Sequence, residues 1–332
     1  MPSTLTIADV SDLVDQSIRD IWIKGSEKES RMFEQYYNVV SGVTDYYLKD
    51  SSISGLGYAS RVVENAVIVA ETPVQGFDKT YTQVNFGKIL PVTKVMWFFG
   101  IQKRKLTAIA DELRAACADM RELRCAERLV NSFSTNYTVS DDAGNWTATT
   151  TGGDGVAMIS ASHTREDGGT DWGNRITDGS TVNMDWEYDA LKAAHRTAAL
   201  IRNPKGKKMN INLDTWVGAK NYTNHHRAVE MLGAMNKGWM PGTAEHDSAG
   251  VITYKILALP WIESNTDYWW MFDSSKKNDT YGLQYKESQG ITLDGPNIVF
   301  RTEEVQYRST VMFDIGFNDS RNWVGSKNTN AA

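Results

Sequence analysis

The chain has 332 residues and a mass of 37.1 kDa, and 41 % of its residues are hydrophobic and 23 % charged. These proportions are those of a globular protein and exclude an intrinsically disordered chain. With 35 Lys and Arg against 41 Asp and Glu, the net charge of −6 disfavours a protein that binds nucleic acid over its whole surface. The sequence has no apolar run of about 18 residues, no secretory signal in residues 1–14 and only 2 cysteines. We therefore expect a soluble, mixed α/β protein of a reducing compartment, with no membrane span.

Aromatic residues are numerous, with 11 Trp, 14 Tyr and 10 Phe. Side chains of this size fill large cores or large contact surfaces between subunits. The length of the chain allows two to three domains.

The first fifty residues predict two short helices. Apolar residues between positions 7 and 21 recur at helical spacing, and Gly25 breaks the pattern. Ser26 and Glu29 form a capping box for a second helix, which we expect to end near Gly42. This segment carries little apolar bulk, so it must pack on the rest of the chain or on a neighbour.

A hairpin with a wide loop is predicted next. Residues 62–69 and 81–90 are rich in strand-forming side chains, and a turn-forming segment, 72–78, lies between them. Neither face of the second strand is apolar enough to complete the core of a monomer, so we expect another chain to cover this edge. The apolar run 95–99 that follows should be buried.

Residues 104–133 give the clearest helical pattern. Apolar side chains form one stripe, from Leu106 through Leu113 and Cys117 to Phe133, and the other faces are charged. About 30 residues without Pro or Gly, at ~1.5 Å each, would extend about 45 Å. We expect a long strut with a single apolar side.

The second half of the chain alternates loops, helices and strands. Residues 134–185 are rich in Thr, Gly and Asp and predict a long loop region with short strands. The elements expected after it are a helix at 186–201, a turn at 203–206, a strand at 209–213, a helix at 215–235, strands at 251–259 and 268–272, and a polar turn at 273–279.

The strongest strand pattern comes last. Val305, Tyr307, Val311 and Phe313 share one face by strict alternation with polar residues. The pattern continues for about 13 residues, where about 5–6 is usual for a strand.

Cysteine and histidine do not form a recognisable site. Cys117 and Cys125 lie eight positions apart on the predicted helix, about 12 Å along its axis, which is too far for a disulfide. We interpret them as buried thiols. His225 and His226 are adjacent, so their side chains diverge on a helix, and the H-E-x-x-H spacing of a helical zinc site is absent. The sequence therefore predicts no metal site.

Two basic clusters stand out, one formed by Arg202, Lys205, Lys207 and Lys208 and the other by 103–105. Either could meet a nucleic-acid backbone or an acidic neighbour. Aromatic residues are not interleaved with them as in a base-stacking platform. We interpret the first cluster as a solvated turn and the second as the entry to a helix.

The motifs of common enzyme classes are absent. The chain has no P-loop, no dinucleotide-binding G-x-G-x-x-G and no G-x-S-x-G nucleophile elbow. Glu187 and Asp189 beside Trp186 could suggest a glycosidase pair, but acids at the start of one helix diverge, and we interpret them as surface residues. Three Asn-x-Thr sequons are interpreted as chance matches: Asn136, Asn145 and Asn221. We assign no catalytic, cofactor-binding or metal-binding residue and expect no cofactor.

The order of these elements resembles that of the major capsid proteins of tailed double-stranded DNA bacteriophages. Local stretches are similar as well, at 155–163, 259–262, 270–273 and 316–323 with 326–328. The resemblance implies an α+β capsid fold divided into an N-terminal arm at 1–50, an E-loop hairpin at 51–95, a P-domain at 96–188 with its spine helix at 104–133, an A-domain at 189–302, and a P-domain return strand with the C-terminus at 303–332.

This resemblance implies a structural protein rather than an enzyme. Its subunits would form pentamers and hexamers that close an icosahedral shell around double-stranded DNA, assembled in the host bacterial cytoplasm and retained in the virion. The implied partners are other copies of the chain, scaffold and portal proteins, optional decoration proteins and non-specifically held DNA, with no membrane. An acidic chain suits a shell that encloses DNA without binding it tightly.

Two family features are not expected here. Some relatives carry a scaffold-like N-terminal extension that a protease removes, but the arm begins at Met1, so the scaffold is expected to be a separate protein or the arm itself. Some relatives form Lys–Asn crosslinks. Lys79 and Lys88 lie in the predicted hairpin, where lysine is common anyway, and we predict no crosslinking.

Two other functions remain open. The Trp content could indicate a β-rich carbohydrate-binding or glycoside-cleaving protein, which would need exposed Trp side chains and, for cleavage, two carboxylates about 5–9 Å apart. An encapsulin-type shell protein or another assembly subunit would share the same contact elements, namely the arm, the projecting hairpin, the long helix and the long last strand. If the capsid interpretation is right, removing residues 72–79 should leave a folded subunit that fails to form stable shells.

Overall fold

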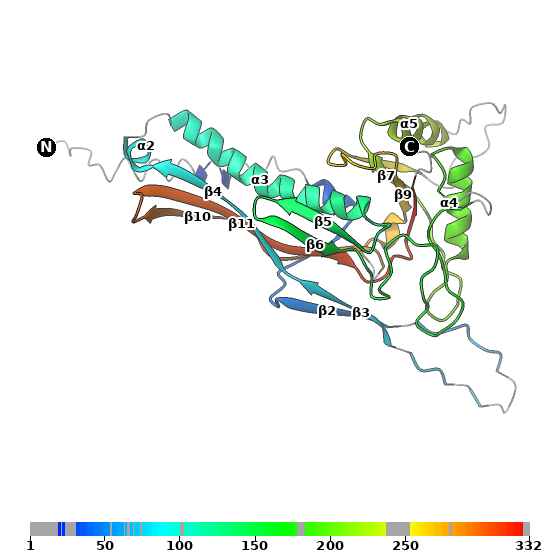
Figure 1. Ribbon diagram of the computed structural model, residues 1–332. Coiled ribbons are helices and arrows are strands. Elements are labelled where there is room, and N and C mark those ends of the chain that lie inside the picture. Colours follow the sequence, from blue (N-terminus) through cyan, green and yellow to red (C-terminus); the bar gives the residue numbers. More distant parts are fainter. Residues whose placement is uncertain are drawn as a thin grey trace.

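The computed structural model describes residues 19–20, 22–23, 31–53, 55–62, 64, 67–68, 70–73, 75–99, 103–177, 183–236, 253–278 and 281–327, with side chains described except at 98–99 and 103–110. Two four-stranded sheets lie in separate parts of the molecule, and a two-stranded ribbon projects from between them (Figure 1). The fold is therefore α+β, as predicted.

A long sheet lies beneath the long helix (Figure 1). Its order is β1 (Asn38–Ser41), β10 (Leu283–Val299), β11 (Glu304–Phe317) and β4 (Val84–Thr93), with β1 parallel to β10 and the other pairs antiparallel. The helix α3 (Lys103–Val130) has 28 residues and packs on β4 and β11. The predicted last strand is confirmed as β11, and its alternating face is buried against the helix and its neighbours.

The second sheet has the order β12 (Trp323–Ser326), β9 (Trp269–Phe272), β7 (Thr215–Ala219) and β8 (Lys255–Leu259). Two helices, α4 (Tyr188–Leu200) and α5 (Thr223–Asn236), lie beside it (Figure 1). The indoles of Trp186, Trp216 and Trp269 are fully buried and in contact, with ring centroids 4.6 and 5.9 Å from Trp186. These three tryptophans therefore belong to the hydrophobic core of this part of the molecule.

The remaining elements are short. They are the ribbon β2 (Tyr47–Ile53) and β3 (Gln75–Thr82), the hairpin β5 (Asn136–Asp141) and β6 (Gly144–Thr149), the helix α2 (Lys94–Phe99), and the 3-10 turns η2 (Met32–Gln35) and η3 (Ser274–Lys276). The loop-rich character predicted for 134–185 is confirmed.

The arm differs from its prediction. The helix expected to end near Gly42 is wrong, because the chain forms η2 and then the strand β1. Val39 and Val40 are β-branched and find backbone partners on β10, at Tyr285 and Lys286. The capping box at Ser26 lies outside the described residues, as does most of the first predicted helix.

The predicted hairpin is displaced along the chain. The described residues of 62–69 contain no strand, and β2 at Tyr47–Ile53 takes that place instead. The predicted strand at 81–90 belongs to two elements, since β3 ends at Thr82 and β4 pairs with β11. The segment predicted as its loop, 72–78, already includes the start of β3. The run 95–99 forms α2, and Val95 is 58 % exposed rather than buried.

Two further predictions are wrong in the second half. The described segment 209–213 contains no strand, and residues 215–219 form the strand β7 rather than the first turn of a helix. Tertiary pairing overrides local helix propensity here, because β7 lies between β8 and β9 and is buried throughout. The strand β10, with 17 residues, was not predicted at all.

The long helix was expected to expose its charged faces, yet Arg121, Glu122, Arg124 and Arg128 are all buried. Glu122 accepts hydrogen bonds from the backbone N–H groups of Met32 at 2.6 Å and Phe33 at 3.1 Å. Its carboxylate therefore supplies acceptors for backbone N–H groups at the start of η2 and links the arm to the helix. Burial raises the pKa of Glu122 to about 7, against the lowering effect of these hydrogen bonds.

This raised pKa predicts a pH-dependent stability. Between about pH 4.5 and 7 the native state holds a proton that the unfolded chain has lost, so stability falls as pH rises through that window. Glu122→Gln should flatten this dependence, which is on the order of 2–3 kcal/mol for a shift of this size. Urea denaturation of unassembled subunits at pH 5 and pH 8 measures it. Glu112→Gln, on an exposed position of the same helix, is the matched control, and an unchanged slope in Glu122→Gln would contradict the assignment.

Candidate functional site: the projecting ribbon and its anchorage

Among the described residues, no group of three or more His, Cys, Asp or Glu side chains could hold a metal ion. Cys117 and Cys125 are buried free thiols, as predicted, and burial raises the pKa of both. None of the described helices is long and apolar enough to cross a membrane.

The carboxylates at the start of α4 do not face each other across a cleft. Glu187 pairs with Arg227 at 3.7 Å, and Asp189 pairs with Lys192 at 3.1 Å. None of the Trp side chains that the structure describes is strongly exposed. The described Trp side chains therefore offer no exposed row for a sugar, and Glu187 and Asp189 are surface residues, as interpreted from the sequence.

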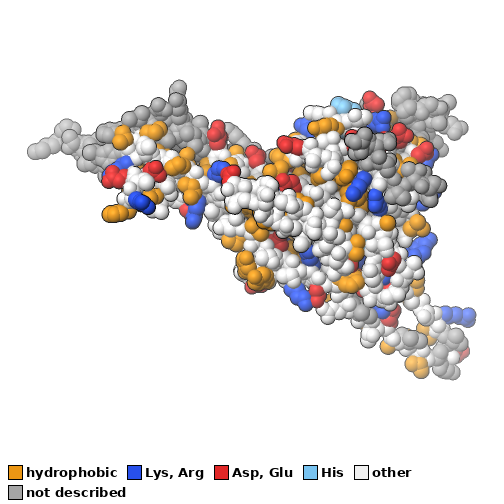
Figure 2. Space-filling view, in the orientation of Figure 1, with side chains coloured by type: hydrophobic (Ala, Val, Ile, Leu, Met, Phe, Trp, Pro, Cys, Tyr) orange, Lys and Arg blue, Asp and Glu red, His pale blue; other side chains and the backbone are white. Residues whose placement is uncertain are grey.

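The segment between β2 and β3, residues 54–74, is here called the ribbon loop. Its described apolar side chains are mostly in solvent, and Val67 is 91 % exposed. With Ile53 at the end of β2, those more than half exposed are Ile53, Leu56, Tyr58, Val62, Val67 and Ile68. Figure 2 shows hydrophobic side chains at this end of the molecule. An apolar surface of this kind marks a contact site for another molecule.

The base of the ribbon is fixed firmly to the body. The Thr82 N–H donates to Asp314 on β11 at 2.8 Å, and Lys79 Nζ donates to the carbonyl of Thr151 at 2.8 Å. Asn318 Nδ2 donates to the carbonyl of Phe77 at 3.2 Å. A Cβ on Gly153 would lie 2.8 Å from the Phe77 Cβ, so only glycine permits this close approach. These contacts fix the orientation of the ribbon base relative to the rest of the molecule.

The ribbon loop itself has weaker contacts. Lys205 pairs with Glu71 at 3.4 Å, the Lys208 N–H donates to the Tyr58 hydroxyl at 3.3 Å, and Lys207 Nζ lies 5.3 Å from the Tyr58 ring. The cluster interpreted as a solvated turn therefore meets an acidic neighbour in the same chain. Partly exposed pairs of this kind contribute about 0–1 kcal/mol, so the loop can exchange them for other contacts at little cost.

The basic cluster's remaining member, Arg202, donates to the carbonyl of Gly206 within the same turn at 3.3 Å. The second basic cluster, 103–105, begins α3, and its side chains lie outside the description. His225 and His226 lie with ring centroids 5.6 Å apart on α5.

A second exposed apolar surface lies at the far end of the long sheet. We call it the sheet tip, and its members are Ile89, Val95, Ile298 and Phe300. Phe300 is fully exposed, in the turn between β10 and β11. In Figure 1 this turn and α2 lie at the opposite end of the molecule from the ribbon loop. Two different contact surfaces at opposite ends suit head-to-tail association, which closes rings when the rotation allows.

Solved structures with a similar fold identify the fold of this chain. No protein-family model matches the chain, and no curated protein matches its sequence. A chain in the capsid structure of the cyanophage P-SCSP1u superposes with a TM-score of 0.53 and 11 % identity, covering 91 % of this chain and 89 % of that one. The chain has a phage-capsid fold. A structure from Mycobacterium phage Adephagia matches with a TM-score of 0.51 and 13 % identity, covering 92 % and 91 %.

The fold class predicted from the sequence is thereby confirmed. The anchors of the ribbon were not predicted. Asp314 was placed on the polar face of the last strand, but its partner, Thr82, lies 232 positions away in the chain. The only sequence signal was a carboxylate within an otherwise apolar stretch of β11.

Proposed function

We propose that this chain is the major capsid subunit of a tailed bacteriophage, which assembles into pentamers and hexamers of an icosahedral shell around double-stranded DNA. The observation that carries the proposal is the match to the cyanophage capsid chain over 91 % of this chain and 89 % of that one, which leaves no large domain for another activity. The exposed ribbon loop and sheet tip support it, since both need covering by a neighbour.

The regions of the subunit follow from the same proposal. Residues 1–50 serve as the arm, 51–95 as the E-loop, 96–188 as the P-domain with its spine helix, 189–302 as the A-domain and 303–332 as the returning segment. The strand β10 pairs with β11 in the long sheet. We therefore move Leu283–Val299 from the A-domain of this division to the P-domain, and β12 from the returning segment to the sheet of the A-domain.

The proposed role is structural and not enzymatic. The partners are other copies of the chain, scaffold and portal proteins, decoration proteins where the virion has them, and DNA held without sequence preference. Subunits would assemble in the bacterial host cytoplasm and remain in the virion. The net charge of −6 supports a shell that does not bind its DNA tightly.

The test is the oligomeric state of the expressed chain. Size-exclusion chromatography and negative-stain microscopy should show rings of five and six subunits or closed hollow spheres. A stable 37.1 kDa monomer that binds a glycan would support the carbohydrate-binding alternative instead. An encapsulin-type shell is distinguished by its contents, because particles from infected cells should carry DNA rather than a protein cargo.

The sheet tip yields a prediction of its own. Phe300→Asp places a charge on a fully exposed side chain, so the subunit should fold normally while its contact with a neighbour weakens. A loss of about 1–2 kcal/mol per contact lowers particle yield by about tenfold or more. Light scattering of assembly reactions measures this yield. Thr302→Asp, at an exposed neutral position of the same turn, is the matched control, and equal losses in both variants would contradict a specific role for Phe300.

A further inference from the structure

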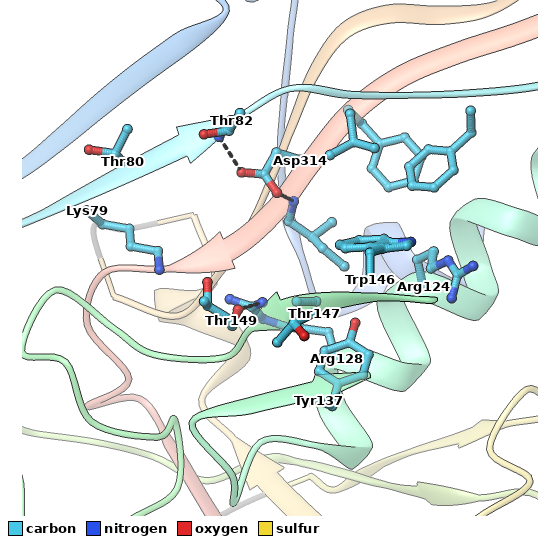
Figure 3. Close-up of a pocket in the computed structure, with 15 residues that line it drawn as sticks. Lys79, Thr80, Thr82, Arg124, Arg128, Tyr137, Trp146, Thr147, Thr149 and Asp314 are labelled. Carbon is cyan, nitrogen blue, oxygen red and sulfur yellow. Dashed lines mark hydrogen bonds between the residues drawn. The ribbon is translucent and has the colours of Figure 1, made fainter. Parts of the chain in front are cut away.

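A cavity of about 200 Å³ lies at the base of the ribbon. Four separate parts of the fold form its walls: β3 and the start of β4, the C-terminal half of α3, the hairpin β5–β6, and the end of β11 (Figure 3). It is large enough for a phosphate-sized ion with water and too small for a nucleotide or a sugar chain.

Two of the three cations at this cavity form no ion pair within 4.0 Å in the described part of the chain. Lys79 and Arg128 line it, and neither has a carboxylate within 4.0 Å among the described residues. Arg124, the third cation of the wall, is already paired with Glu127 at 2.7 Å and Asp141 at 3.8 Å. Asp314 is the acid of the wall and interacts with both Lys79 and Arg128 at longer range, so what this site lacks is a hydrogen-bond acceptor rather than net negative charge.

The Arg128 guanidinium is buried with an unused donor. The residue is 5 % exposed, and its Nη1 donates to the carbonyl of Thr149. Its Nε has no hydrogen-bond partner in the part of the chain that the structure describes. A buried N–H donor without an acceptor costs about 1–3 kcal/mol, which an anion in the cavity would offset.

Both carboxylate oxygens of Asp314 already accept hydrogen bonds. Its two oxygens accept the backbone N–H groups of Thr82 and Ile315, both at 2.8 Å. In Figure 3 the Lys79 ammonium and the Arg128 guanidinium approach the cavity from β3 and α3, with the hydroxyl-bearing Thr147 and Thr149 beside them. Burial, with a smaller contribution from the charge of Arg128, lowers the pKa of Lys79 to about 8.

We propose that this cavity binds a small tetrahedral oxyanion, such as inorganic phosphate or sulfate, between Lys79 and Arg128. The Lys79 ammonium and the free Arg128 Nε–H donate to it, and the threonine hydroxyls complete the site. Because Lys79 belongs to the ribbon and Arg128 to the long helix, the bound anion ties the ribbon base to the body. This ligand site does not depend on whether the chain forms a phage shell.

The test uses the purified full-length subunit and inorganic phosphate as the probe. Phosphate should raise the melting temperature above that in sodium chloride of equal ionic strength, and should slow hydrogen exchange at the amides of β3. Lys79→Met should weaken phosphate binding by about tenfold in isothermal titration calorimetry. Affinity for phosphate should also fall as pH rises through about 8, where Lys79 loses its proton, and this dependence should vanish in the variant.

The matched control is Lys88→Met. Lys88 lies on the neighbouring strand β4, outside the cavity wall, and pairs with Asp142 in solvent. Its variant should bind phosphate within about twofold of the parent chain. Equal effects of phosphate and chloride, or equal affinities of the Lys79→Met and parent chains, would overturn the proposal. Arg128→Met is a further variant, but Lys79→Met decides the matter if Arg128→Met fails to fold.

Discussion

Replacing residues 54–74 with Asn-Gly is expected to give a folded subunit that forms no closed shells. Ile53 and Gln75 are directly paired across β2 and β3, so a two-residue turn closes the shortened ribbon without strain. Among the described residues, the replacement removes the weak interactions of Glu71 and Tyr58 with the basic turn and the Gly57–Glu71 hydrogen bond within the loop. Between copies, it would remove every interaction made by the exposed apolar side chains of the loop.

Circular dichroism and thermal melting should show a change of only a few degrees, whereas negative-stain microscopy should show particle numbers reduced at least about 100-fold. This replacement is a more specific test than removal of residues 72–79, because that deletion also removes Phe77 and Lys79, which anchor the ribbon base. Normal particles from the shortened ribbon would refute its role in joining subunits.

Point variants separate the apolar surface from the length of the loop. Val67→Asp with Ile68→Asp adds two charges to strongly exposed apolar positions and should reduce assembly nearly as far as the replacement does. The matched control adds the same charges at exposed polar positions of the loop, Ser60→Asp with Thr72→Asp, and should assemble normally. Equal defects in both pairs would indicate that charge alone, and not loss of apolar contact, prevents assembly.

The sequence predicted best the elements whose packing is regular. The strand β11 keeps apolar side chains at alternate positions of one face, on which Ser309 is the polar exception. Its partner β10 is longer but has three register shifts, between Glu287 and Gln289, between Gln289 and Thr292, and between Asp294 and Asn297. Each irregularity moves the side chains out of phase, and a period-2 search therefore misses the strand.

The strand β2 of the ribbon was missed by the sequence prediction for a different reason. The strand β2 pairs only with β3 in the described sheets; one of its faces is exposed, and the other, Leu48, Asp50 and Ser52, is partly buried but mostly polar. The sequence of β2 therefore has no alternating apolar pattern, and the strand was predicted instead at the apolar residues 62–69 of the ribbon loop. Those side chains have the composition of a strand because they are suited to contact, but the described ones form no strand within this chain.

The candidate site was predictable as a region but not as a set of residues. Its anchors join positions far apart in the sequence, such as Lys79 with Thr151 and Asn318 with Phe77. The burial of the charged residues of α3 was missed for a similar reason. Arg124 and Arg128 lie under β4 and the hairpin β5–β6, and a single helix pattern contains nothing about what covers its polar face.

A buried ion-pair network joins the loop region after β6 to the C-terminal segment. The Arg321 guanidinium pairs with Glu166 at 3.0 Å and with Asp319, and it lies 4.9 Å from the ring centre of Trp172. The side chains of Arg321, Glu166 and Asp319 are 2 %, 5 % and 8 % exposed. This segment leads directly into β12, so the network holds the second sheet's edge strand near the loop.

Arg321→Met is therefore expected to destabilise the subunit by about 3–5 kcal/mol, because it leaves two buried carboxylates without their counter-charge. Burial already raises the pKa of Asp319, and Arg321 opposes that rise. In the variant the pKa of Asp319 should rise further, so the native state binds a proton more readily than the unfolded chain. Stability of the variant should consequently fall as pH rises, and it should partly recover towards pH 5.

Urea denaturation of unassembled subunits at pH 5 and pH 7.5 measures both effects. The matched control is Arg308→Met, since Arg308 pairs with Asp294 at 2.8 Å at the surface, where both side chains are more than half exposed. That variant should lose less than about 1 kcal/mol at either pH. A second comparison, Arg321→Met combined with Glu166→Leu and Asp319→Leu, removes the stranded carboxylates and should regain most of the lost stability. If Arg321→Met behaves like Arg308→Met, the network contributes no more than a surface pair, and the C-terminal segment must be held by its packing alone.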